Sequence, residues 1–99
     1  MRKQRTIEKL SNEISNSITK EFKKSFKKLR WLRNNNFIKK LDIFIENQKH
    51  PSLRSKRIKG SSILYESSIN MSIRVIWIYQ GEYLIVMLDI GHHDILKRY

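Results

Sequence analysis

Three short segments in the C-terminal half of the chain have the composition of β-strands, with a short break after each of the first two. The segments cover residues 63–69, 72–79 and 83–90, with breaks at 70–71 and 80–81. β-Branched and aromatic residues, which favour strands, dominate them. Breaks this short allow only antiparallel neighbours, because parallel strands need a long crossover connection. The sequence therefore predicts an antiparallel meander of three strands.

Two helical patterns precede the strands. Over residues 20–33, Phe22, Phe26, Leu29 and Leu32 recur at helical spacing, and lysines fill the other faces. The second pattern covers residues 36–48 and has its apolar stripe at Phe37, Ile38, Leu41, Phe44 and Ile45. Because the connection between them is short, the two helices are expected to run antiparallel.

Polar residues mark the ends of these elements. Thr19 is the expected N-cap of the first helix, and the asparagines at 34–36 form a break and a cap before the second. His50 ends the second helix because a residue before proline disfavours the helical conformation. Residues 54–60 are interpreted as a loop or a short edge segment. Gly91 is expected to stop the last strand, before a short tail that could cross back over the sheet.

Length and composition limit the class of protein. The 99 residues have the size of one domain, so we interpret residues 1–99 as a single domain. The absence of cysteine excludes a disulfide framework and a thiol nucleophile, and it fits a reducing cytoplasm. The apolar runs VIWIY and LIVML are too short to span a bilayer, and the basic N-terminus does not resemble a secretory signal. We therefore expect a soluble, cytoplasmic protein with no membrane partner.

Positive charge is concentrated in the first 59 residues. The formal net charge is +12; residues 1–59 hold 18 Lys and Arg against 5 Asp and Glu, and residues 60–99 hold 3 against 4. Charge segregated in this way favours nucleic acid or another acidic partner. The alternative is a basic surface that serves only solubility.

Arg74 lies within a strand segment that is otherwise apolar. A buried guanidinium is costly without a partner. Either a bound anion or a cross-strand ion pair with Glu66 or Asp89 would satisfy it, and in so basic a chain the best candidate anion is an RNA phosphate. A cluster of titratable residues follows the next strand, at His92, His93 and Asp94.

Five segments carry a resemblance to a known family. They are FKKSFKKL in the first helix, NQKHPSLRSKRIKG at the end of the second, and LYES, IRVIWIY and LDIGHHD in the strands. In this order and spacing they resemble the RelE/ParE superfamily of toxins from bacterial type II toxin–antitoxin systems, and in particular its RelE- and YafQ-like mRNA endonucleases. The resemblance implies an α+β fold of two N-terminal helices packed on a twisted antiparallel sheet of three to four strands. It also implies an RNase that cleaves mRNA on the ribosome with no metal or other cofactor, and a cognate antitoxin that neutralises it.

The resemblance extends to individual positions. Arg74 matches the strand arginine that holds the scissile phosphate, and His93 matches a position held by a catalytic histidine or arginine. Asp94 follows it, as an acidic residue often does. His50 matches a histidine that contributes to catalysis in the YafQ-like branch. Tyr99 matches a terminal aromatic that stacks on a base or tunes the proton transfer.

Two features depart from the family pattern. The strand before Arg74 reads YESS and lacks the lysines of RelE-like members, which moves the acid–base chemistry to histidine. The family's first strand begins near residue 1, whereas residues 1–18 here are mostly polar. That region is therefore an N-terminal extension or an altered first strand; Ile7, Leu10, Ile14 and Ile18 have helical spacing, and a short strand at 14–18 is the alternative.

Attack of a 2′-hydroxyl on the adjacent phosphate needs a base, an acid and positive charge. Histidine can perform either proton transfer near neutral pH, and arginine binds phosphate through its planar fork. The catalytic candidates are therefore Arg74, His93, His50 and Asp94, with Glu66 as a minor candidate base. The candidate RNA-binding residues are Lys23, Lys27, Arg54, Lys56, Arg57, Lys59, His92 and Tyr99.

Each candidate also has a purely structural interpretation. His50 could only cap a helix, Asp94 could cap the turn of the tail, and Tyr99 could fray as the last residue. In an extended tail His92 and His93 would point to opposite faces, so that only one would enter the site. A metal site built from the three histidines and Asp94 is disfavoured, because adjacent histidines rarely share one metal ion.

Two other functions remain open at this point. One is a non-enzymatic, ParE-like toxin that binds DNA gyrase, and the other is a decayed toxin that persists as a binding module. The acid–base groups after Gly91 favour the nuclease, because a gyrase-binding protein has no need of them. The absence of the strand lysines is the reason to retain the hypothesis of a decayed toxin.

Overall fold

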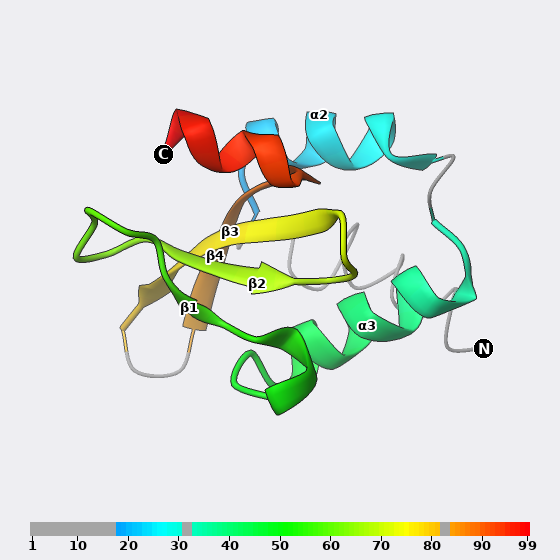
Figure 1. The fold of residues 1–99 in the computed structure, drawn as a ribbon, viewed down its shortest axis with the longest axis horizontal. Coiled ribbons are helices and arrows are strands. Elements are labelled where there is room, and N and C mark those ends of the chain that lie inside the picture. Colours follow the sequence, from blue (N-terminus) through cyan, green and yellow to red (C-terminus); the bar gives the residue numbers. More distant parts are fainter. Residues whose placement is uncertain (1–17, 31–32, 82–83) are drawn as a thin grey trace.

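The computed structural model describes residues 18–30, 33–81 and 84–99. In the view of Figure 1, helix α3 lies at the bottom, the strands of the four-stranded sheet lie in the middle, and helices α2 and η5 lie at the top. The predictions for residues 1–17 and for Leu32 lie outside the described residues. Ile18 is described, and it forms an isolated parallel bridge with Met87.

The first two described helices begin at the predicted caps. In α2 (Lys20–Lys28) the Thr19 hydroxyl accepts a hydrogen bond from Phe22 N at 3.0 Å. In α3 (Asn35–Glu46) Asn34 Oδ1 accepts one from Phe37 N at 2.9 Å. Both bonds satisfy amides that have no partner within the helix. The two helices run in opposite directions, as expected (Figure 1).

Both helices are shorter than predicted. The pattern predicted a first helix over 20–33, but α2 ends at Lys28 because Leu29 N bonds to the Phe26 carbonyl and tightens the last turn. The second helix was expected to reach residue 48 but ends at Glu46. There the Gln48 side chain donates to the carbonyls of Phe44 and Ile45, which caps the helix with a residue of the following loop.

The sheet has the strand order β1-β2-β3-β4, and each neighbouring pair is antiparallel. The strands are β1 (Lys56–Arg57), β2 (Tyr65–Ser68), β3 (Ile73–Gln80) and β4 (Leu84–His92). The predicted meander is confirmed, and the short edge segment within 54–60 is β1. The expectation that Gly91 stops the last strand is wrong, because Gly91 pairs with Arg74 and the strand continues to His92.

One face of the sheet forms the core. The buried residues on that face include Val75, Trp77, Met87 and Ile90 of the strands, and they cluster with Phe22, Phe37, Leu41 and Phe44 of the helices. The rings of Phe44 and Trp77 meet edge to face, with centroids 5.8 Å apart. Burial of this apolar surface is the main stabilising contribution to the fold. Because side chains alternate along a strand, Glu66, Arg74 and Asp89 lie on the opposite face.

The C-terminal residues fold back over that second face. They form the 3-10 helix η5 (His93–Arg98), which confirms the tail that crosses the sheet. The expectation of an extended tail is wrong: His92 ends β4 and His93 begins η5, so the two histidines do not alternate along one strand. Tyr99 does not stand free either, because its hydroxyl donates to Asp89 Oδ2 at 3.0 Å.

Within the described ranges, no helix has both the length and the apolar character needed to cross a membrane.

Candidate functional site

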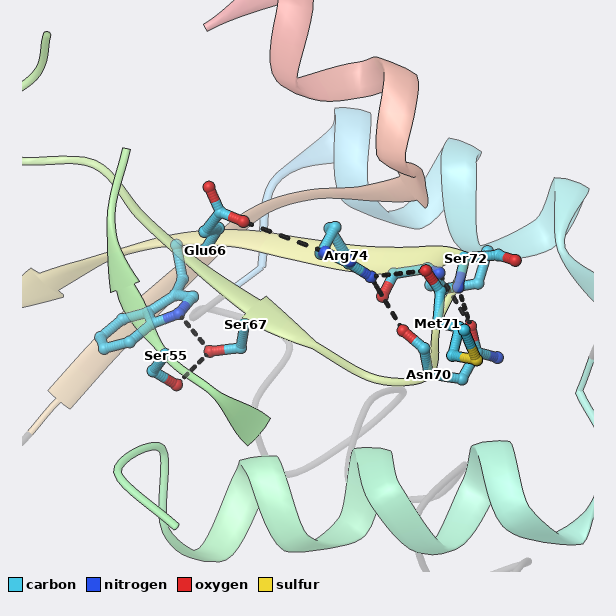
Figure 2. Close-up of polar contacts among 9 residues, drawn as sticks. Ser55, Glu66, Ser67, Asn70, Met71, Ser72 and Arg74 are labelled. Carbon is cyan, nitrogen blue, oxygen red and sulfur yellow. Dashed lines mark hydrogen bonds and ion pairs between the residues drawn. The ribbon is translucent and has the colours of Figure 1, made fainter. Parts of the chain in front are cut away.

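Arg74 is held at the turn between β2 and β3. Its Nη1 donates to the carbonyl oxygens of Asn70, Met71 and Ile73 at 2.8, 3.2 and 3.2 Å (Figure 2). Its Nε lies 3.9 Å from Glu66 Oε1, so the predicted ion pair forms with Glu66. Asp89 is instead paired with Arg98. The guanidinium is therefore fixed by one edge, and among the described residues no hydrogen bond engages Nη2.

The turn that holds Arg74 is shaped by one side chain. Asn70 Oδ1 accepts hydrogen bonds from the backbone N–H groups of Ser72 and Ile73, both at 2.8 Å. This is the local pattern by which asparagine substitutes for a backbone turn. It directs the carbonyls of residues 70 and 71 toward the guanidinium, as Figure 2 shows.

His50 caps the 3-10 turn η4 (Pro51–Leu53) rather than helix α3. Its Nδ1 accepts a hydrogen bond from Ser52 N at 3.1 Å and lies 2.8 Å from Ser52 Oγ. While Nδ1 accepts from the Ser52 amide, the neutral ring has its proton on Nε2. In the other tautomer Nδ1 donates to Ser52 Oγ, and Nε2 is then able to accept a proton.

The loop that carries His50 is anchored to the sheet by a chain of hydroxyls. Ser55 Oγ donates to the Gln48 carbonyl at 2.6 Å and lies 2.5 Å from Ser67 Oγ, which accepts from Trp77 Nε1 at 2.9 Å. Figure 2 shows Ser55 and Ser67 below the sheet, toward α3. Lys40 Nζ adds a hydrogen bond from α3 to the Ser52 carbonyl at 3.0 Å. Buried polar groups satisfied in this way hold a loop in one position.

Arg74 and His50 line one cavity, which we call the Arg74 cavity. It has a volume of about 620 Å³ and lies between α3, the η4 loop and the β2–β3 turn. Its polar lining includes Lys39, Lys40, His50, Ser52, Arg54, Ser68, Asn70 and Arg74. The cavity thus joins a phosphate-binding type of side chain and a proton-transfer type in a basic setting.

The C-terminal candidates occupy a different place. His92, His93 and Asp94 are exposed, and none of them is among the described residues that line the Arg74 cavity. His93 N donates to the Ser72 carbonyl at 2.8 Å, which places the start of η5 beside the same turn that holds Arg74. Asp94 lies in the first turn of η5. The structure therefore brings His50 and Arg74 into one cavity and leaves His93 at the neighbouring end of the hairpin.

The sequence interpretation missed a contact between the buried Asp89 and the partly exposed Tyr99. The Asp89 side chain is fully buried, its Oδ1 accepts from Ile90 N at 2.9 Å, and Arg98 Nη2 lies 3.5 Å from its Oδ2. Burial and the hydrogen bond to Asp89 raise the pKa of the Tyr99 hydroxyl to about 12. The signal was present, because an aspartate within the run LIVMLDI needs a partner.

The predicted RNA-binding cations are dispersed. Lys23 and Lys27 lie exposed on α2, and Lys56, Arg57 and Lys59 lie exposed in and after β1. Of the predicted basic contacts, Arg54 lines the Arg74 cavity, where Lys39 and Lys40 join it. The helical pattern gave no reason to single out those two lysines, because only packing of α3 against the η4 loop places them there.

Among the described residues, no group of three or more His, Asp or Glu side chains is placed to hold a metal ion.

Solved structures share this fold. YafQ from E. coli, in a toxin–antitoxin complex with DinJ, superimposes with a TM-score of 0.65 at 16% identity, over 81% of this chain and 92% of that chain. A copper-bound mutant toxin from Helicobacter pylori gives 0.64 at 18% identity, over 81% and 94%. YoeB from Staphylococcus aureus, a dimer, gives 0.59 at 13% identity, over 78% and 93%. The fold is RelE-like.

The likeness is one of three-dimensional structure. No protein-family model matches the sequence, and no curated protein matches it. The RelE-like fold nevertheless confirms the α+β arrangement that the five sequence segments implied.

Proposed function

We propose that this chain is the toxin of a type II toxin–antitoxin system, an endoribonuclease that cleaves mRNA on the ribosome in the cytoplasm without a metal ion. The observation that carries the proposal is the Arg74 cavity, which both Arg74 and His50 line. The RelE-like fold, shared with YafQ and YoeB, supports it. Because YafQ is found in complex with DinJ, we also propose a cognate antitoxin as the protein partner.

The proposed reaction is an intramolecular transfer within the RNA. The 2′-oxygen loses its proton to a base and forms a bond to the adjacent phosphorus, while the bond from phosphorus to the 5′-oxygen breaks and that oxygen takes a proton from an acid. The products are a 2′,3′-cyclic phosphate and a free 5′-hydroxyl. Arg74 binds the scissile phosphate through Nη2 and stabilises the charge that builds up on its oxygens.

His50 is proposed as one of the two proton-transfer groups. For Nε2 to accept a proton, Nδ1 must carry the ring proton and donate it to Ser52 Oγ, which lies 2.8 Å away; the doubly protonated ring can then give up a proton from Nε2. His93 is proposed as the second group, because the start of η5 is tied to the β2–β3 turn through Ser72. Asp94 lies next to His93 in η5 and is proposed to orient it.

The test is cleavage of a translated mRNA by the purified protein in EDTA, with and without ribosomes. We expect wild-type protein to cleave, and Arg74→Lys and His93→Ala to lose about 100-fold or more in rate, since a positioned acid or base contributes 10²–10⁴-fold. Arg74→Lys keeps the charge but loses the fork, and it avoids an empty space at the turn.

His50→Asn is the matched variant for the capping interpretation. Asparagine Oδ1 accepts from Ser52 N as Nδ1 does, so the cap and the melting temperature are preserved while Nε2, the proposed proton-transfer atom, is lost. Full activity of His50→Asn would show that His50 only caps the η4 turn and transfers no proton. Absence of cleavage by folded wild-type protein, together with inhibition of gyrase supercoiling, would replace the nuclease with a gyrase-binding toxin.

A further inference from the structure

A second cavity, which we call the tyrosine cavity, adjoins the Arg74 cavity. It has a volume of about 320 Å³, and Tyr65, Trp77, Tyr79, Lys49, His50 and Arg54 line it. His50 and Arg54 line both cavities, so the two are neighbours that share these side chains as a wall. We propose that the tyrosine cavity binds a nucleobase of single-stranded RNA whose neighbouring phosphate occupies the Arg74 cavity. The inference rests on the proposed RNA substrate and adds a base-binding site to it.

The aromatic rings of the cavity form a fixed platform. Tyr65 stacks on Trp77 with centroids 4.8 Å apart and an interplanar angle of 22°. Tyr79 meets both rings edge-on, at 5.2 Å from Tyr65 and 5.0 Å from Trp77. Trp77 is buried, whereas 39% of Tyr79 is exposed, so Tyr79 offers a ring to a ligand while its neighbours hold it. Such rings bind bases of any sequence, because every base has a π-face.

Polar contacts hold the platform in place. Trp77 Nε1 donates to Ser67 Oγ at 2.9 Å, and Arg57 Nε donates to Tyr65 Oη at 3.3 Å. The Arg57 guanidinium also lies over the Tyr65 ring, 5.8 Å from its centroid. A platform that is ordered before binding avoids the entropic cost of ordering it afterwards.

The cations at the cavity select a nucleotide over an uncharged apolar ligand. Lys49 and Arg54 are exposed beside the rings, and Lys39 continues the basic lining into the Arg74 cavity. A groove that combines backbone-tracking cations with stacking rings is the general design of single-strand binding. An acidic peptide would satisfy the cations but would have no planar group for Tyr79.

The test measures binding of a short 2′-O-methyl oligoribonucleotide, which cannot be cleaved because its 2′-oxygens are blocked. We expect Tyr79→Leu to weaken binding about 5- to 100-fold, the loss of one stacked base, and Tyr79→Phe to bind as wild type does. An abasic oligomer of the same length, which carries the phosphates alone, should bind equally to all three proteins.

Leu84→Ala is the matched control, because Leu84 is 58% exposed on β4 and lines neither cavity. Equal binding of the base-bearing oligomer by wild type and Tyr79→Leu would overturn the proposal, and cleavage of unmodified RNA by the same wild-type preparation in a parallel assay would show that the nuclease function survives. Binding that depends on Tyr79 without cleavage would support the base site and overturn the nuclease. A polyglutamate peptide bound with the same dependence on Tyr79 would assign the cavity to an acidic protein partner and overturn the proposal.

Discussion

Gly91 has no side chain at a point where another element needs the space. A Cβ at this position would lie 2.6 Å from Ile95 Cγ2, closer than side-chain carbons approach. Gly91 pairs with Arg74 across β3 and β4. The glycine therefore allows η5 to close over the strand beside the candidate phosphate-binding arginine.

We expect Gly91→Ala to lower the free energy of unfolding by about 1–3 kcal/mol, the usual cost of added volume at a packed contact. Urea denaturation measures it. In an Ile95→Ala background the same change should cost less, because the clashing methyl group is gone. An equal cost in both backgrounds would show that Ile95 is not the cause.

At the scale of elements, polar contacts with Asp89 hold the C-terminal end of η5, while the His93 amide holds its start. Tyr99 closes the chain by donating to the buried Asp89, and Arg98 adds a longer ion pair to the same carboxylate. Burying Asp89 without these partners would be costly. These contacts therefore hold η5, and with it His93, against the sheet.

The raised pKa of Tyr99 predicts how stability depends on pH. The hydroxyl keeps its proton to about pH 12 in the fold but to about pH 10 in the unfolded chain, so its contribution is complete below pH 10 and is lost as the pH rises to 12. We expect Tyr99→Phe to be less stable than wild type by about 1 kcal/mol at neutral pH, a value reduced for partial exposure.

The difference between the two proteins should shrink as the pH rises from about 10 to about 12. Urea denaturation of both across that range tests the prediction. Lysine deprotonation in the same range affects both proteins alike, so the comparison removes it. If the difference in the free energy of unfolding stays constant across this pH range, the prediction for Tyr99 is wrong.

At the scale of the whole molecule, the proposed RNA substrate would meet a chain with a net charge of +12. The Arg74 cavity holds only part of that charge, and α2 carries exposed lysines away from it. We expect the affinity for single-stranded RNA to fall steeply with salt, with the slope of log affinity against log salt reduced by about 0.7 for each phosphate contact removed.

Replacing Lys23 and Lys27 by glutamine tests whether α2 takes part. If α2 docks RNA, the double variant lowers the slope by about 1.4. Replacing Lys39 and Arg54 is the matched pair within the cavity. A slope unchanged by the α2 variant but lowered by the cavity variant would confine the docking face to the cavity. If the affinity of wild type for RNA does not change with salt, the basic helices do not contact RNA.

Most of the secondary structure could be predicted, because its causes act over a few residues. The caps at Thr19 and Asn34, the short hairpin breaks and the composition of the strands are local signals. Helix ends were less predictable. Leu29 fits the apolar stripe of a longer helix, but it lies in the tightened turn that ends α2. Its side chain is buried in the core from that position, and the local sequence does not indicate this.

The sequence indicated which side chains could take part in the candidate site. Only the tertiary structure showed which of them lie together. Arg74, His50 and the histidines after Gly91 were recognisable by their chemistry. Which of them meet is decided by contacts between distant segments: the hydroxyl chain from Ser55 to Trp77 sets the loop of His50 beside the β2–β3 turn.

The sequence alone determined the strands, the caps, the charge and the kinds of side chain available, because each follows from short-range periodicity or from composition. The tertiary structure alone decided that His50 shares a cavity with Arg74, that Asp89 buries against Tyr99, and that Tyr65, Trp77 and Tyr79 form one platform. These contacts join residues far apart in the chain, and their geometry depends on how all the elements pack at once.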